Sequence, residues 1–161
     1  MTGFRKQNRL VKYDYSSPGY YFITSCTKNR LEHFGVVEKG IMIQNDTGKI
    51  AEEIWKRTPL FYRDVSVDEF IIMPNHIHGI IIINPPKQAG GLRYSLSQIV
   101  GSYKNTVTKL ARQNNKEFAW QPSFYDHVIR KDESLDKIRD YVRNNPLQWE
   151  LDKNNPENLW M

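Results

Sequence analysis

The stretch Met73-Pro74-Asn75-His76-Ile77-His78-Gly79-Ile80-Ile81-Ile82-Ile83 is the most informative part of this sequence. Its second half is almost entirely isoleucine, and β-branched residues favour a strand, which we expect over His76–Ile83. Side chains alternate between the two faces of a strand, so both imidazoles share one face and Ile77 lies on the other. Apolar residues on both faces predict a central strand that is covered on both sides.

Two neutral imidazoles at this spacing can bind one metal ion, together with further oxygen or nitrogen ligands. The competing interpretation is that His76 and His78 are core histidines whose ring nitrogens are satisfied by hydrogen bonds within the fold. The spacing alone leaves both interpretations open.

The rest of the chain predicts alternating strands and helices. Further strands are expected over 20–27, 65–73 and 124–129, with a small hairpin over 35–43. Helices are expected from about Thr47 to Pro59, after the capping box Ser95-x-x-Gln98, and from Asp132 or Ser134 to about Asn144, where Pro146 stops the helix. The order β-α-β-β-α-β is that of a ferredoxin-like α+β sandwich with an antiparallel sheet, here followed by an additional C-terminal helix.

The length predicts one domain, and the charge is compatible with a polyanionic partner. The 161 residues carry a net charge of +5, with a basic N-terminal arm at about 1–15 and a polar tail at about 150–161. Residues 87–116 contain no Asp or Glu. Lys104, Lys109 and Arg112 lie off the apolar stripe of the helix in that segment, toward solvent. Together with the missing acids, this indicates a surface that contacts phosphates; an ordinary solvated face is the alternative.

Several classes of protein are excluded by what the sequence lacks. Cys26 is the only cysteine, which excludes a disulfide framework and a cysteine-based zinc site. Residues 2–15 lack the apolar core expected of a signal peptide, and the sequence has no apolar run long enough for a membrane span and no Walker-type loop for a nucleotide cofactor. These features predict a cytoplasmic protein that uses no membrane and no nucleotide cofactor.

The last helix carries the remaining polar candidates. Leu135, Ile138 and Val142 fall on one face and are expected to pack on the sheet, while Tyr141 and Asn145 lie four residues apart at the edge of that face. If the helix crosses the free face of the sheet, both side chains point toward the histidine pair. Otherwise Tyr141 is a core-edge tyrosine and Asn145 a C-terminal cap.

Three segments resemble a known family. Residues 73–78 are similar to the His-hydrophobic-His signature of HUH endonucleases in their single-tyrosine transposase form. Residues 120–130 and 141–146 are similar to the matching segments of REP-associated tyrosine transposases, and with residues 20–30 the resemblance covers most of 20–149. The resemblance implies a ferredoxin-like catalytic domain that cuts and rejoins single-stranded DNA near hairpins.

The resemblance also implies roles for single residues. Tyr141 matches the nucleophile that forms a covalent phosphotyrosine, and His76 and His78 match the metal-binding pair. Asn145 falls where related insertion-sequence transposases have a glutamine ligand, but its side chain is one methylene shorter. The expected cofactor is Mg²⁺ or Mn²⁺, and the expected partner is single-stranded or hairpin DNA, on which the protein would associate with the nucleoid. A homodimer is compatible with the sequence.

Two other functions remain open at this level. A ferredoxin-like module could bind nucleic acid without catalysis, through its basic surface and aromatic side chains. Alternatively, a metal phosphoesterase could use water as the nucleophile, with Tyr141 serving only in packing.

Overall fold

The computed structural model describes residues 10–131 and 135–152. Most of the basic arm expected at 1–15, most of the tail expected at 150–161, and the two candidate caps Asp132 and Ser134 lie outside the described residues.

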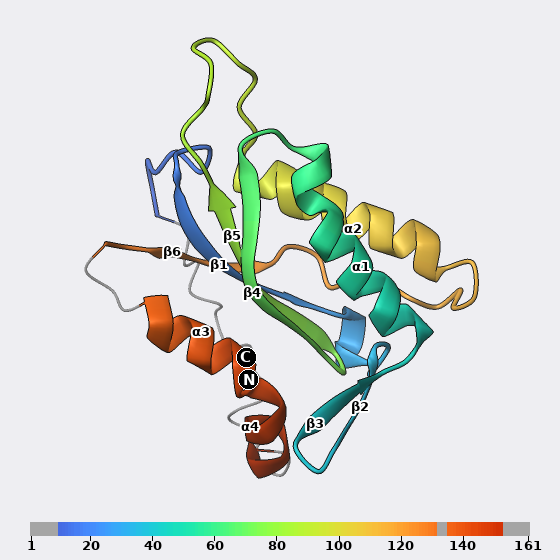
Figure 1. The fold of residues 1–161 in the computed structure, drawn as a ribbon. Coiled ribbons are helices and arrows are strands. Elements are labelled where there is room, and N and C mark those ends of the chain that lie inside the picture. The colour runs from blue at the N-terminus through green and yellow to red at the C-terminus, as the bar shows by residue number, and fades with distance from the viewer. Residues whose placement is uncertain (1–9, 132–134, 153–161) are drawn as a thin grey trace.

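Four strands form an antiparallel sheet in the order β4-β5-β1-β6 (Figure 1). They are β1 (Gly19–Cys26), β4 (Val65–Met73), β5 (His76–Ile83) and β6 (Tyr125–Ile129). Helix α1 (Asp46–Phe61) precedes β4, and helix α2 (Leu96–Ala111) lies between β5 and β6. The predicted ferredoxin-like β-α-β-β-α-β order is therefore confirmed.

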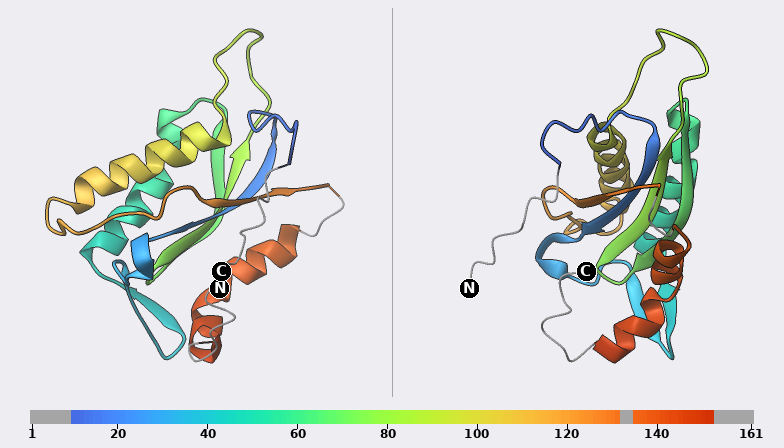
Figure 2. Two further views of the ribbon diagram at one scale, coloured as in Figure 1. Left: turned by 180° about the vertical axis from the view of Figure 1, so that it is seen from behind. Right: turned by 90° about the vertical axis from the view of Figure 1, so that its left-hand side faces the viewer.

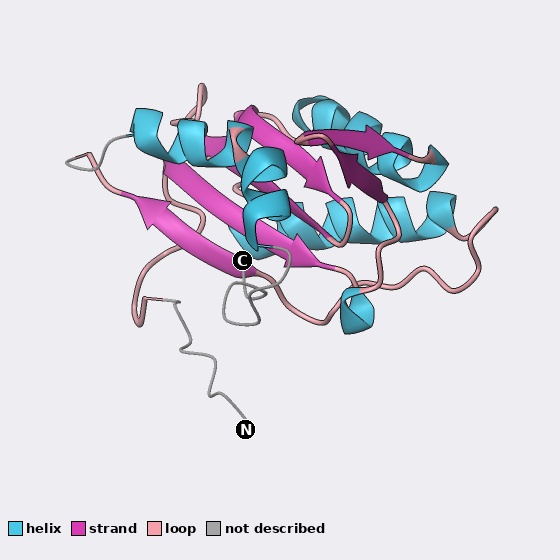
Figure 3. Ribbon diagram, turned by 90° about the horizontal axis from the view of Figure 1, so that it is seen from below, coloured by secondary structure: helices cyan, strands magenta, loops and turns pink. Residues whose placement is uncertain are grey.

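The main hydrophobic core lies between this sheet and the layer of α1 and α2 (Figures 2 and 3). Because side chains alternate along β5, Ile77 and Ile81 enter this core while the histidines face the other way. Trp55 of α1 packs directly over Gly79, where an added Cβ would lie 2.3 Å from the indole Cζ2.

Both of these helices begin as their sequences predict. The Asn45 side chain accepts a hydrogen bond from the Gly48 amide at the start of α1, and Ser95 and Gln98 form the expected capping box of α2. The predicted end of α1 is wrong, because Pro59 lies within the last turn and the helix continues to Phe61. Proline removes the amide donor to the carbonyl four residues earlier, yet the chain stays helical for two more residues.

The opposite face of the sheet carries α3 (Leu135–Arg143) and a smaller apolar cluster (Figure 3). Val142 is buried there against Phe22 and Ile80, and Leu135 and Ile138 pack around them. The predicted apolar face of the last helix is thus confirmed.

A further helix was not predicted from the sequence. Pro146 follows the end of α3, but it stands in the first turn of α4 (Asn145–Asp152), where proline is favoured. Helix α4 runs toward the small hairpin of β2 (Gly35–Glu38) and β3 (Ile41–Gln44), and Leu147 lies against the hairpin turn at Gly40 (Figure 1). Among the described residues, no helix has both the length and the apolar character required to cross a membrane.

Candidate active site

His76 and His78 lie side by side on β5, on the face of the sheet that α3 covers. Both are almost completely buried, with 2% and 1% of their surface exposed, and their ring centroids are 4.6 Å apart. Phe22 of β1 stacks on the His78 ring at 5.4 Å. The predicted convergence of the two imidazoles is therefore present in the fold.

Each imidazole is oriented through its Nδ1 atom. The Asn75 Oδ1 atom lies 2.7 Å from His76 Nδ1, and the Asn75 amide nitrogen donates to the Arg30 carbonyl. An amide oxygen only accepts, so His76 Nδ1 carries the proton and His76 Nε2 carries the lone pair. The Thr24 hydroxyl lies 2.7 Å from His78 Nδ1 and holds that ring in place, although a hydroxyl can donate or accept and so does not fix the tautomer.

The two Nε2 atoms are buried and have no hydrogen-bond partner among the described residues. Burial lowers the pKa of His76 to about 4 and lowers the pKa of His78 well below its usual value, so both rings are neutral at pH 7. Buried acceptors without donors are costly. Neutral imidazoles whose Nε2 atoms have no other partner among the described residues are a ligand set that fits a divalent metal ion.

Tyr141 reaches the histidines from α3. Its ring lies 5.5 Å from the His78 ring and 6.1 Å from the Phe22 ring, measured between centroids. The tyrosine is half-buried at the edge of the smaller apolar cluster, as its position on the helix predicts. The helix that carries Tyr141 therefore crosses the free face of the sheet, which is one of the two arrangements that the sequence left open.

Asn145 and Trp149 complete this end of the site from α4. Asn145 is 8% exposed, and its side chain interacts with His76, where it opposes part of the burial effect on the histidine pKa. Asn145 is the first residue of α4. The Trp149 ring lies 5.9 Å from the His76 ring, a contact that the sequence did not predict because α4 was not expected.

A family model described as "Transposase IS200 like" matches residues 16–145, which include the histidine pair and Tyr141. The chain belongs to the IS200-like transposase family. Transposases are DNA-processing enzymes, and the resemblance identified from the three sequence motifs is confirmed by this match.

Similar proteins agree with this assignment. An uncharacterized protein of Haemophilus influenzae is 39% identical over 165 residues, covering 92% of each chain. A second protein of that organism, which carries the name REP-associated tyrosine transposase, is 24% identical over 142 residues, covering 84% of this chain and 74% of its own.

Solved structures have the same fold. A REP-associated tyrosine transposase bound to a REP hairpin has a TM-score of 0.63 at 18% identity, covering 87% of this chain and 73% of its own. A protein of Deinococcus radiodurans assigned to the transposases has a TM-score of 0.52 at 13% identity, covering 84% of this chain and 95% of its own.

Of the basic residues expected to bind DNA, Lys104 and Lys109 lie on α2 of this transposase and Arg112 directly follows it, on the far side of the sheet from the histidines (Figure 3). The Lys104 amine donates to the carbonyls of Gln121 and Ser123, at 2.9 and 2.8 Å. Arg112 donates through Nε to the Phe118 carbonyl, and Lys109 is exposed. The fold thus brings Tyr141 and Asn145 to the histidine pair, but not the three basic residues.

Proposed function

We propose that this transposase cleaves and rejoins single-stranded DNA through a covalent bond to Tyr141. The observation that carries the proposal is the tyrosine ring 5.5 Å from His78, beside two buried imidazoles whose Nε2 atoms have no partner among the described residues. A non-catalytic binding module needs neither a tyrosine beside the pair nor the energetic cost of two open, buried nitrogen atoms.

In the first step, Tyr141 Oη attacks the phosphorus of a phosphodiester. An O–P bond to the tyrosine forms, the bond from phosphorus to one sugar oxygen breaks, and the phenol proton passes to solvent while the sugar oxygen is protonated. In the second step, a hydroxyl of another DNA end attacks the phosphotyrosine and regenerates the phenol. One phosphodiester replaces another, so no ATP is required.

His76 and His78 would hold a divalent cation through their Nε2 atoms, with the Asn145 amide oxygen as a third ligand. A bound Mg²⁺ or Mn²⁺ offsets the charge that develops on the phosphate and on the attacking phenolate. Asn75 and Thr24 keep the two rings turned so that Nε2 faces the site.

The substrate that we propose is a DNA hairpin with single-stranded flanks. The structural relative bound to a REP hairpin supports this choice, and the net charge of +5 favours a polyanion. A single-stranded flank can enter a site between one helix and a sheet face more readily than a duplex can, because a duplex is wide and stiff.

The test uses hairpin DNA labelled at both ends, incubated with the protein and Mn²⁺ and separated on a denaturing gel. The wild-type protein should form a covalent adduct and a cleaved strand. Tyr141→Phe should bind the hairpin but form neither product, and His78→Ala should bind the hairpin with adduct formation greatly reduced.

Tyr125→Phe is the matched control, because Tyr125 is 44% exposed at the edge of the sheet and also contacts Phe22. This variant should behave as the wild type. Cleavage by Tyr141→Phe at the wild-type rate would instead indicate a phosphoesterase that uses water. Binding without any metal-dependent product in the wild type would indicate a non-catalytic module.

A further inference from the structure

Strand β4 contains a bulge at the point where α3 crosses it. Its pairing with β5 shifts between Val67 and Phe70, so three steps along β4 match two along β5. Consecutive residues of a regular strand point to opposite faces, but at this bulge both Asp68 and Glu69 reach helix α3. The bulge therefore presents two adjacent carboxylates to one helix.

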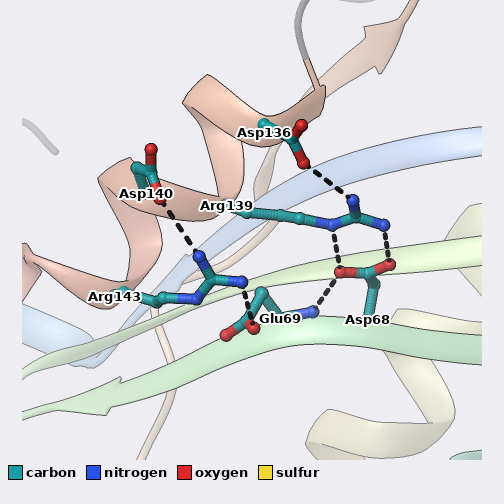
Figure 4. Close-up of polar contacts among 6 residues, drawn as sticks. All are labelled: Asp68, Glu69, Asp136, Arg139, Asp140 and Arg143. Carbon is teal, nitrogen blue, oxygen red and sulfur yellow. Dashed lines mark hydrogen bonds and ion pairs between the residues drawn. The ribbon is translucent and has the colours of Figure 1, made fainter.

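Two arginines of α3 bind these carboxylates (Figure 4). Arg139 forms a two-point contact with Asp68, Nε to Oδ1 at 2.9 Å and Nη2 to Oδ2 at 2.7 Å. Arg143 donates to Glu69 at 2.8 Å. The Asp68 side chain is only 16% exposed, and the hydrogen bonds from Arg139 lower its pKa. We call Asp68, Glu69, Arg139 and Arg143 the α3 clamp.

The Nη1 atom of each arginine donates a hydrogen bond to a carboxylate of α3 itself. Arg139 Nη1 donates to Asp136 and Arg143 Nη1 donates to Asp140, each at 3.1 Å. These contacts give each guanidinium group a second partner, on α3 itself.

The clamp and Tyr141 occupy opposite flanks of α3. At about 100° per residue, Arg139 and Arg143 are about 40° apart, whereas Tyr141 lies about 160–200° from them. Between the flanks lie Ile138 and Val142, which pack on the sheet. Apolar packing is non-directional and permits a helix to roll, whereas a two-point Arg–carboxylate contact has one geometry.

From this arrangement we propose that the α3 clamp orients Tyr141. It fixes the roll and the axial position of α3 from the β4 side, so that the tyrosine on the other flank faces His78. These four residues are positioning residues that act through Tyr141. The inference rests on the proposed function, to which it adds the source of the tyrosine geometry.

The test removes the clamp charges while keeping the side-chain shapes, in the double variant Asp68→Asn with Glu69→Gln. The first measurement is the single-turnover rate of adduct formation with the hairpin at saturating Mn²⁺. We expect a decrease of about tenfold to a hundredfold, because small misplacement of a reacting group has effects of that size. Hairpin affinity should not change.

The second measurement needs no activity. In protein labelled with 3-fluorotyrosine, the ¹⁹F resonance of residue 141, assigned by its loss in Tyr141→Phe, reports the adjacent Phe22 and His78 rings. In the clamp variant this resonance should move toward the value of an unfolded tyrosine. Arg57→Gln is the control, because it breaks the exposed Arg57–Glu53 pair on α1, at 2.7 Å, and should change neither measurement.

An unchanged resonance together with an adduct rate within about twofold of the wild type would overturn the inference. If the double variant does not fold, Arg143→Gln alone serves, since Arg143 is 52% exposed, with a smaller change expected in the same directions. If the wild type forms no adduct, the proposed function fails, and the ¹⁹F measurement still decides whether the clamp orients Tyr141.

Discussion

His76 and His78 combine features that are unfavourable for histidines with a purely structural role. Each ring is buried, each is neutral at pH 7, and each Nε2 atom lacks a partner among the described residues. Because the protonated form is disfavoured by burial, the unfolded chain binds protons more readily at these positions than the folded chain does. The stability of the metal-free protein therefore depends on pH.

The pKa of His76 is about 4 in the folded chain and 6.5 without the effects of the fold. Between these values the unfolded chain holds more protons, so the free energy of unfolding of the metal-free protein should fall as pH falls from 6.5 toward 4. A shift of this size corresponds to roughly 3 kcal/mol. Urea unfolding in the presence of a chelator at several pH values in this window measures the effect.

His76→Gln is the informative comparison, because glutamine does not titrate. Its free energy of unfolding should decline less steeply than that of the wild type over the same window. Parallel curves for the two proteins would contradict the assignment of this pH dependence to His76.

At the scale of the element, α2 shows that basic residues on one helix have different roles. Lys104 is half-buried, and its amine bridges the carbonyls of Gln121 and Ser123 in the segment that leads into β6. Burial lowers its pKa. Lys109, on the same helix, is exposed. Lys104 therefore connects α2 to the loop before β6, and Lys109 is free to face a polyanion.

Substituting each of these two lysines in turn should show that Lys104 affects stability and that Lys109 affects DNA affinity. Lys104→Met should lower the free energy of unfolding by about 2 kcal/mol, since two carbonyls lose a charged donor. Lys109→Ala should change stability by less than about 0.5 kcal/mol. If Lys109 contacts a phosphate, its loss should also reduce the slope of log affinity against log salt by about 0.7.

Denaturant unfolding and DNA titrations at several salt concentrations give both quantities. A Lys104→Met variant as stable as the wild type would remove the structural role of that amine. An unchanged salt slope for Lys109→Ala would indicate an ordinary solvated side chain.

On the scale of the whole molecule, the sheet separates a packing side from a site side. The packing side holds the larger core, in which Trp55 packs directly over Gly79. The site side holds a smaller apolar cluster, the histidines and α3. Gly79 follows His78 on β5. Helix α1 therefore packs on one face of the same strand whose other face carries the histidines.

Gly79→Ala should therefore destabilise the whole fold, by about 1–3 kcal/mol, because its Cβ would lie 2.3 Å from Trp55 Cζ2. Trp55→Phe removes the clashing ring atoms, so in the double variant the two costs should be less than additive. Gly101→Ala in α2 is the control. Its Cβ meets no atom within 4 Å, and it should stabilise the helix by about 1 kcal/mol. Urea unfolding of the wild type and the four variants checks these expectations, and a Gly79→Ala variant as stable as the wild type would contradict them.

The fold was predictable wherever it depends on local periodicity. The alternation of β5, the capping box at Ser95 and the apolar face of α3 each follow from residues close together in the chain. The failure was at proline. Pro59 was interpreted as a helix end, but it lies within the last turn of α1. Pro146 does follow the end of α3, as predicted, but it also lies in the first turn of α4, a helix that was not expected. The consequence of a proline depends on its place within a turn, which local pattern does not specify.

For the site, the sequence by itself determined that His76 and His78 share a face and that Tyr141 and Asn145 share a helix edge, because strand and helix periods are local properties. Only the tertiary structure decided that α3 crosses the sheet over the histidines, that Trp149 approaches His76, and that Lys104 is occupied by backbone carbonyls. It also decided that a bulge in β4 meets the arginines of α3. These contacts join residues far apart in the chain, and their geometry comes from how the helices pack on the sheet, which no local period encodes.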